Sequence, residues 1–332
     1  MSQAPFLEPL HAERVRRRVR EIMERHRHSA IGLIGQTEIV ELDRVNRHLP
    51  VRVLAKLEGQ NPSGSVKDRL ALYLVADAME RGVSSDDILV EASSGNTGVS
   101  LAMLCARLGL RLIVTVADNV SVERFKIMRA FGVEVVLTPG ELGTCGAIEK
   151  ARELGEQPGH FWVAQHFNQV NSFAHYETTG VEIAAQIRAL EINTLDAFVA
   201  STGTTGTLMG ISARLKERYP ELEVVSVWPV DKIMGIRRPE GEGKPTIYDE
   251  RRIDRVVEVR SAEAMAMLRR IAREEGILCG ISGGAAVVGA LATAERRRSE
   301  SGSGTVLVLL PDWGERYLSL KEFEFAAREA KR

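Results

Sequence analysis

Apolar positions along the chain follow two alternating patterns. Short continuous apolar runs, which are typical of strands buried on both faces of a sheet, alternate with longer stretches whose apolar residues recur every three or four positions, as in amphipathic helices. Strands that alternate with helices of this length form parallel βαβ units, so the sequence predicts an α/β fold. The predicted strands are residues 51–57, 88–92, 110–116, 133–137, 160–164, 197–200, 224–229 and 305–310. The predicted helices are residues 66–81, 97–108, 122–131, 146–154, 176–189, 208–218, 262–275 and 284–299.

An arginine-rich segment, residues 11–28, precedes the first predicted strand. Val15, Val19, Ile22 and Met23 recur in it at helical spacing, which predicts an amphipathic helix with one solvated face. A charge run of this kind can also be an arm that binds nucleic acid or an acidic partner. We favour the solvated helix face, because that is what most charge runs are.

Composition narrows the class of protein. The chain has 332 residues with 44 basic and 45 acidic side chains, so it lacks the overall positive field of a nucleic-acid-binding protein. Cys105, Cys145 and Cys279 are far apart and form no C-x-x-C pair, which indicates reduced thiols and a cytoplasmic protein. No apolar run approaches the roughly 18–20 residues that a bilayer requires, so we expect no membrane span. The histidines lack acidic or cysteine partners at ligand spacing, so we expect no metal site.

One lysine lies where a ligand site is expected. In open parallel sheets, ligands bind at the carboxyl ends of strands, where the following helices begin. The segment 61–69, Asn-Pro-Ser-Gly-Ser-Val-Lys-Asp-Arg, has such a position. Lys67 falls in the first turn of the predicted helix, where the positive end of the helix dipole disfavours an ammonium group. A lysine placed there is suited to form a Schiff base or to act as a proton-transfer base, although position alone is equally consistent with an exposed surface lysine.

Three further turns enter predicted helices. Residues 91–98, Glu-Ala-Ser-Ser-Gly-Asn-Thr-Gly, bring more short polar side chains and glycines to a helix N-terminus than capping alone requires, which suits a carboxylate or a phosphate. Residues 201–207, Ser-Thr-Gly-Thr-Thr-Gly-Thr, offer backbone amides, hydroxyls and a helix dipole together, as a phosphate-binding loop does. This loop matches neither a Walker A motif nor G-x-G-x-x-G, which argues against a nucleotide. In the turn at residues 279–286, Ser282 is either a polar ligand contact or an N-cap.

A reactive lysine, a phosphate-binding loop and a separate carboxylate-binding turn are what pyridoxal phosphate and an amino-acid substrate require. At these residues the sequence resembles the fold type II pyridoxal phosphate enzymes, because segments 61–69, 93–98 and 203–207 look like their three signature segments. Within that group the chain is similar to the cysteine synthases, or O-acetylserine sulfhydrylases, and the Gly-Thr-Thr-Gly-Thr loop is closest to the B-type enzymes. The similarity runs from about residue 31 to residue 320 and includes residues 178–183, 235–238 and 311–319.

The resemblance implies a fold of two lobes, each an open, twisted, mostly parallel sheet flanked by helices, as in the β subunit of tryptophan synthase. Residues 61–164 would form the smaller lobe, which carries the substrate carboxylate loop. Residues 1–60 together with residues 165–332 would form the larger lobe, which carries the phosphate loop. The cofactor would lie between the lobes, and the enzyme would be a homodimer.

The same resemblance implies roles for individual residues. Lys67 would hold pyridoxal 5'-phosphate as an internal aldimine, Asn96 would contact the ring hydroxyl, and Ser282 would contact the pyridine nitrogen. The phosphate would be bound by Gly203, Thr204, Thr205, Gly206 and Thr207. The substrate carboxylate would be bound by Ser93, Ser94, Asn96 and Thr97.

The implied reaction is β-replacement on an activated L-serine, either O-acetylserine or O-phosphoserine. The β-substituent would leave to give an α-aminoacrylate, and a sulfur nucleophile would add to give L-cysteine, so the chain would be a transferase of cysteine biosynthesis. One alternative keeps this intermediate but adds an amine, as a 2,3-diaminopropionate synthase does. Another is a non-catalytic regulatory homologue that binds the C-terminal peptide of a partner. Lys67 argues against it, because an inactive pocket has no use for the amine.

One position departs from the family pattern. His166 stands where the family has a glutamine that helps to bind the substrate carboxylate. The histidine can bind the carboxylate itself, distinguish another leaving group or nucleophile through a titratable proton, or be a tolerated substitution. Arg237 and Arg238 are either an oxyanion site for an anionic substrate such as O-phosphoserine or thiosulfate, or a solvated pair.

Overall fold

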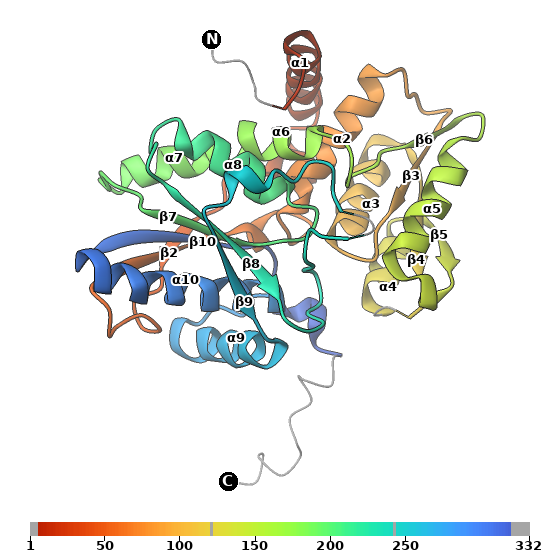
Figure 1. Cartoon of the computed structure of the whole chain (residues 1–332). Helices are drawn as coiled ribbons and strands as arrows, with labels where there is room; N and C mark the ends of the chain where they lie inside the picture. The colour runs from red at the N-terminus through yellow and green to blue at the C-terminus, as the bar shows by residue number, and fades with distance from the viewer. Residues whose placement is uncertain (1–5, 120–121, 242–243, 320–332) are drawn as a thin grey trace.

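The structure is a computed structural model that describes residues 6–119, 122–241 and 244–319 (Figure 1). The strands are β1 (Ile39–Glu41), β2 (Val51–Leu57), β3 (Ile88–Ala92), β4 (Arg111–Ala117), β5 (Glu134–Thr138), β6 (His160–Trp162), β7 (Ala197–Ser201), β8 (Glu223–Pro229), β9 (Arg255–Val259) and β10 (Gly304–Leu310). The α-helices are α1 (Pro9–Arg25), α2 (Lys67–Glu80), α3 (Asn96–Leu108), α4 (Val122–Ala130), α5 (Gly143–Gly155), α6 (Val170–Glu177), α7 (Thr179–Ala189), α8 (Gly206–Lys216), α9 (Ser261–Glu275) and α10 (Ile281–Ser301). Short 3-10 helices are η1 (Ala30–Leu33), η2 (Glu58–Gln60), η3 (Gly140–Leu142), η4 (Glu250–Arg252) and η5 (Gly314–Tyr317).

The strands form two sheets. The larger has the strand order β1-β2-β10-β7-β8-β9, and the smaller has the order β5-β4-β3-β6. β1 is antiparallel to β2, and the other strand pairs of the described chain are parallel. β10, the last strand of the described chain, lies inside the larger sheet, where Val306 is opposite both Val53 and Ala197. The predicted α/β fold with parallel sheets is confirmed.

Both faces of the six-stranded sheet are covered by helices. Val53 and Val199 face the cluster that contains apolar residues of α9 and α10, whereas Leu54 and Phe198 face the cluster formed with α7 and α8. Adjacent residues of one strand therefore point to opposite faces, as the pleat of a strand requires. Figure 1 shows the two layers, with α9 and α10 below the sheet and α7 and α8 above it.

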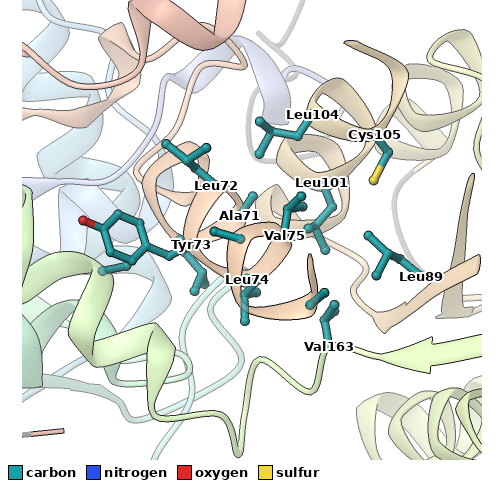
Figure 2. Close-up of a cluster of buried hydrophobic side chains, with 14 of the residues drawn as sticks. Ala71, Leu72, Tyr73, Leu74, Val75, Leu89, Leu101, Leu104, Cys105 and Val163 are labelled. Carbon is teal, nitrogen blue, oxygen red and sulfur yellow. The ribbon is translucent and has the colours of Figure 1, made fainter. Parts of the chain in front are cut away.

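The four-stranded sheet is also covered on both faces. Leu89 faces the helices α2 and α3, and Figure 2 shows it beside apolar side chains of these helices, among them Val75 and Leu101. Val90, the next residue of β3, faces Ala147 of α5 on the other side. This packing fixes where α2 and α3 begin relative to the sheet, and the first residues of these two helices are Lys67 and Asn96.

The structure differs from the predicted elements in three places. The predicted helix 176–189 is two helices, because the φ angle of −118° at Thr178 interrupts the helical backbone between α6 and α7. The predicted strand 160–164 ends at Trp162, since Ala164 has a positive φ of 54°. β1 and β9 were not predicted, because both are edge strands without a continuous apolar run. The sequence also predicts an exposed loop at residues 239–246, where glycines and prolines stand among charged residues, and residues 242 and 243 of it lie outside the described residues.

The arginine-rich segment forms α1, which packs on α2 through buried residues such as Val15 and Val19. Several of its arginines form ion pairs within the chain. Arg16 pairs with Glu177 at 2.8 Å, and Arg18 pairs with Glu80 at 2.8 Å. These contacts favour the packed amphipathic helix over a nucleic-acid-binding arm.

The three cysteines are free thiols, as the sequence predicts. Cys105 and Cys279 are buried, and burial raises the pKa of each thiol to about 12. Both side chains are therefore packing groups and not nucleophiles at neutral pH. None of the helices in the described part of the chain is both long and apolar enough to cross a membrane.

Candidate active site

The four turns that the sequence predicts as ligand sites each lead into the N-terminus of a helix. β2, β3 and β7 end at one edge of the sheets, and the helices α2, α3 and α8 that follow them begin there, at Lys67, Asn96 and Gly206. The fourth turn enters α10 at Ile281 and is joined to the segment after β10 by an isolated bridge between Cys279 and Trp313. The arrangement concentrates backbone N–H groups and positive helix ends in one region.

Lys67 is the first residue of α2 and is partly buried. Its Nζ lies 3.5 Å from the hydroxyl oxygen of Thr207, so the lysine turn and the phosphate-binding loop face each other. Burial lowers the pKa of Lys67 to about 8, although the negative charges of Asp312 and Glu58 partly oppose this shift. At pH 7 about a tenth of the amine is therefore uncharged, far more than for an ordinary lysine, and the uncharged form is the one that acts as a nucleophile or a base.

His175 supports the Thr207 hydroxyl from behind. Its Nε2 is 3.2 Å from Thr207 Oγ1, and its Nδ1 is 3.0 Å from Thr179 Oγ1. Burial and the charges of Lys67 and Arg69 hold the pKa of His175 well below its usual value, so the ring is neutral. Nothing in the sequence predicts this role of His175, because its contact with Thr207 joins α6 to α8.

The loop between β7 and α8 has the geometry of an anion site. Thr205 has a left-handed backbone with φ of 69°, which turns successive N–H groups toward a common point at the start of α8. A Cβ on Gly206 would lie 1.9 Å from the side-chain oxygen of Asn171, so only glycine fits there. Asn171 Nδ2 in turn donates to Thr204 Oγ1 at 2.9 Å. The buried hydroxyl of Thr205 has no hydrogen-bond partner. These donors fit a phosphate group.

The asparagine turn, residues 93–98, is held by four hydrogen bonds. Ser93 Oγ accepts hydrogen bonds from the N–H groups of Gly95 and Gly98 and so caps α3. Thr97 Oγ1 donates to Gln165 Oε1 at 2.7 Å. The carbonyl oxygen of Ser94 accepts a hydrogen bond from Arg124 at 3.4 Å. The hydroxyls of Ser93 and Thr97 therefore already serve the turn itself.

Glu91 and Gln165 form a buried pair behind this turn that sequence reasoning missed. The carboxylate of Glu91 accepts hydrogen bonds from the backbone N–H groups of Gln165 and Ala92. Burial raises the pKa of Glu91 to about 7, and these hydrogen bonds limit the shift. An acidic residue at the end of an apolar strand was the available signal, since a buried carboxylate needs donors.

His166 and Arg237 flank the lysine. Burial, together with the positive charges of Arg237 and Lys67, lowers the pKa of His166 to about 3, so its imidazole is neutral at physiological pH. Arg237 Nε lies 3.4 Å from the carbonyl oxygen of Gly203, and its buried Nη2 has no partner. Arg238 points to the opposite side of the chain, where it donates to Pro229 O at 3.0 Å and pairs with Glu258. The structure therefore brings only the first arginine of the pair to the cluster.

Ser282 is buried in the first turn of α10. Gly280 is the N-cap of this helix and has no side chain, so Ser282 is not the capping residue. A Cβ built on Gly235, two residues before Arg237, would lie 4.0 Å from Ser282 Cβ. The serine and the Arg237 segment are thus neighbours across the site, which leaves the serine hydroxyl available for a ligand.

The described residues contain no group of three or more His, Cys, Asp and Glu side chains that could hold a metal ion. The chemistry of the cluster is that of an amine with a lowered pKa, a phosphate-binding loop and neutral hydrogen-bonding groups.

Comparison with known proteins gives consistent matches. Residues 31–312 match the family model described as pyridoxal-phosphate dependent enzyme. A cysteine synthase from Staphylococcus aureus is 41% identical over 304 residues, 88% of this chain and 96% of that protein. A cysteine synthase B from Pseudomonas aeruginosa is 42% identical over 289 residues, 86% of this chain and 94% of that protein. Among solved structures, an O-ureido-L-serine synthase aligns with a TM-score of 0.81 at 40% identity, covering 91% of this chain and 98% of the other.

Proposed function

Because the chain belongs to the family of pyridoxal-phosphate dependent enzymes, we propose that it catalyses β-replacement on an activated L-serine, with a sulfur nucleophile that gives L-cysteine. The family match confirms the resemblance found in the sequence, and with it an enzyme that uses pyridoxal phosphate. The observation that carries the proposal is Lys67, whose amine, with a pKa of about 8, faces Thr207 of the phosphate-binding loop. A non-catalytic homologue would not need such an amine.

The residues described above fit the cofactor. The amides and hydroxyls of residues 203–207 would bind its phosphate, Asn96 its ring hydroxyl, Ser282 its pyridine nitrogen, and Lys67 would hold it covalently. When bound, pyridoxal phosphate withdraws electrons from the substrate α-carbon and so acidifies the α-proton. A serine hydroxyl cannot hold the pyridine nitrogen protonated as a carboxylate would, which favours elimination and replacement over transamination.

Lys67 then handles the substrate proton. The unprotonated amine of Lys67 would take the α-proton of the bound substrate and later return a proton to the α-carbon. The β-substituent would leave as acetate or phosphate, and the nucleophile would add at the β-carbon. The hydroxyl of Ser94, the backbone N–H groups of the asparagine turn and the neutral ring of His166 would bind the substrate carboxylate.

Cysteine formation tests this function directly. The purified protein, loaded with pyridoxal phosphate, should convert O-acetyl-L-serine or O-phospho-L-serine and sulfide into L-cysteine, with one acetate or phosphate released per cysteine. Product is measured by chromatography, and each donor is also incubated without sulfide. If neither donor loses its β-substituent under either condition, the proposed function is wrong.

Arg237 should determine how well the enzyme accepts an anionic donor. Arg237→Met should raise KM for O-phosphoserine about tenfold or more, because the free Nη2 can pair with a phosphate, and change KM for O-acetylserine by less than about twofold. Arg238→Met is the matched control and should leave both KM values unchanged, since Arg238 is already paired with Glu258. Equal losses with both donors in Arg237→Met would mean that Arg237 only supports the carbonyl of Gly203.

A second nucleophile class has a specific observation in its favour. The alignment with the solved structure of an O-ureido-L-serine synthase covers 98% of that chain at 40% sequence identity. Its name describes a product in which oxygen is bonded to the β-carbon, so an oxygen nucleophile joins sulfide and the amine-adding alternative in the experiment above. Hydroxyurea and ammonia are offered in place of sulfide, and the nucleophile with the highest kcat/KM identifies the product.

The remaining predictions rest on the family resemblance. We propose a homodimer and a cytoplasmic location, the latter supported by three free thiols. The division into a lobe of residues 61–164 and a lobe of the remaining residues is also part of this proposal.

A further inference from the structure

A buried carboxylate lies at the centre of the cluster and has no role in the mechanism above. Asp312 lies two residues after the last residue of β10 and is fully buried. Its Oδ2 accepts a hydrogen bond from Asn96 Nδ2 at 2.7 Å and another from the hydroxyl of Tyr317 at 2.5 Å. Its other oxygen, Oδ1, has no hydrogen-bond partner. Burying a carboxylate costs free energy unless hydrogen bonds or charges compensate it, so the place of Asp312 in the site calls for a functional explanation.

The same asparagine is held from its other side. Arg316 Nη1 donates to Asn96 Oδ1 at 2.8 Å, so the carboxamide of Asn96 lies between a carboxylate and a guanidinium. The two contacts allow only one orientation of the amide. If it rotated by half a turn, its NH₂ group would face the Arg316 guanidinium, and its oxygen would face the Asp312 carboxylate. Asn96 Nδ2 carries two hydrogens and donates one of them to Asp312. The second hydrogen can be donated to a ligand.

The backbone leaves room for both charged side chains. A Cβ on Gly280, at the entrance to α10, would lie 2.0 Å from Asp312 Oδ1. A Cβ on Gly64, in the lysine turn, would lie 2.6 Å from Arg316 Nη2, and Gly64 also has a positive φ of 84°. Asp312 and Arg316 therefore fit against the turns that carry Ser282 and Lys67, and glycine is needed at both contact points.

A further contact ties this segment to the asparagine turn. The guanidinium of Arg124, on α4, stacks over the ring of Tyr317 at 5.0 Å and donates to Ser94 O. Tyr317, in turn, holds Asp312. The segment 312–317 thus reaches the asparagine turn both through Asn96 and through Arg124.

We propose that Asp312 and Arg316 are positioning residues that orient the Asn96 carboxamide so that its free N–H faces the ring oxygen of the cofactor. The inference rests on the proposed function, because it takes pyridoxal phosphate as the ligand of Asn96. The two residues act only through Asn96. Their contribution to cofactor binding must therefore disappear when Asn96 is removed.

A double-mutant cycle on cofactor binding tests this. The variants are Asp312→Asn, Arg316→Met, Asn96→Ala and the two doubles with Asn96→Ala. The readouts are the dissociation constant of pyridoxal phosphate and the absorption maximum of the bound cofactor, and neither depends on turnover. In the parent background, Asp312→Asn and Arg316→Met should each weaken cofactor binding about tenfold and shift the absorption maximum. In the Asn96→Ala background, each should change the constant by less than about twofold.

Two controls separate positioning from a structural role. Glu315→Gln, an exposed neighbour of Arg316, should change neither readout. Arg316→Lys should recover part of the binding, because a lysine can still donate to Asn96 Oδ1. If Asp312→Asn does not fold, the cycle of the partly exposed Arg316 decides alone.

The possible results are distinct. Equal losses with and without Asn96, or no loss in either background, overturn the inference. A parent protein that binds no pyridoxal phosphate overturns the proposed function instead. If the parent binds the cofactor and forms cysteine, but the effects of Asp312→Asn and Arg316→Met do not depend on Asn96, only the positioning role is overturned.

Discussion

Lys67→Ala should lower kcat/KM for cysteine formation by about 10⁴-fold or more and prevent covalent attachment of the cofactor. The amine has two functions in the proposed reaction, as the covalent anchor and as the base, and general base catalysis alone is worth about 10²–10⁴ in rate. Its pKa of about 8 and its contact with Thr207 make it the amine that fits both functions. The measurements are cysteine formation and the protein mass after borohydride reduction, which retains a covalently bound cofactor in the parent.

The control for Lys67→Ala is Lys232→Ala, which removes an exposed lysine elsewhere in the chain and should leave activity and mass unchanged. Cofactor that is bound without a covalent bond should still enter the Lys67→Ala site, because the phosphate-binding loop is intact. A borohydride-stable adduct in Lys67→Ala would show that another amine is the anchor.

Arg69→Met should lower the free energy of unfolding by about 3–5 kcal/mol, because it leaves buried charge without a partner. Arg69 Nε and Nη2 each donate to the fully buried Glu58 at 2.8 Å, and Nη1 donates to Glu182 at 2.9 Å. Burial alone would raise the pKa of Glu58, but the Arg69 guanidinium outweighs it and keeps the pKa below its usual value. Without that guanidinium, Glu58 must either protonate or remain charged in an apolar environment.

The matched control is Arg152→Met on α5. Arg152 pairs with Glu149 at 2.7 Å, but both side chains are more than half exposed, at 55% and 66%, so the change should cost less than about 1 kcal/mol. Both variants are compared with the parent by urea and thermal unfolding. Similar losses for the two arginines would mean that the network of Arg69, Glu58 and Glu182 adds no more stability than a surface ion pair.

Local sequence accounts for much of the site. The turn with Lys67 and the loop at residues 203–207 could be identified because strand, glycine-rich turn and helix start follow one another along the chain. The same reasoning could not separate Arg237 from Arg238, since two adjacent arginines of the same chemistry look alike in the sequence. That distinction depends on the partner Glu258, which the sequence does not place beside Arg238.

The contacts that sequence reasoning missed connect distant parts of the chain. Asn96 meets Asp312, His175 meets Thr207, and Arg69 meets Glu182. Each of these pairs depends on the tertiary fold, and one chain without an alignment carries no signal for it. The break at Thr178 and the edge strand β9 were missed for a similar reason, because packing and sheet position override local preference there.

The central place of β10 has a consequence for the order in which the protein is made. Ribosomes deliver a chain from its N-terminus, so β2 and β7 emerge before the strand that separates them in the sheet. Until β10 arrives, the edges of β2 and β7 that it will occupy are open to wrong pairing. Asp312 and Arg316 emerge just after it, so the nascent chain cannot complete the Asn96 contacts earlier. Chaperone protection during translation should therefore matter most between the emergence of β7 and that of β10.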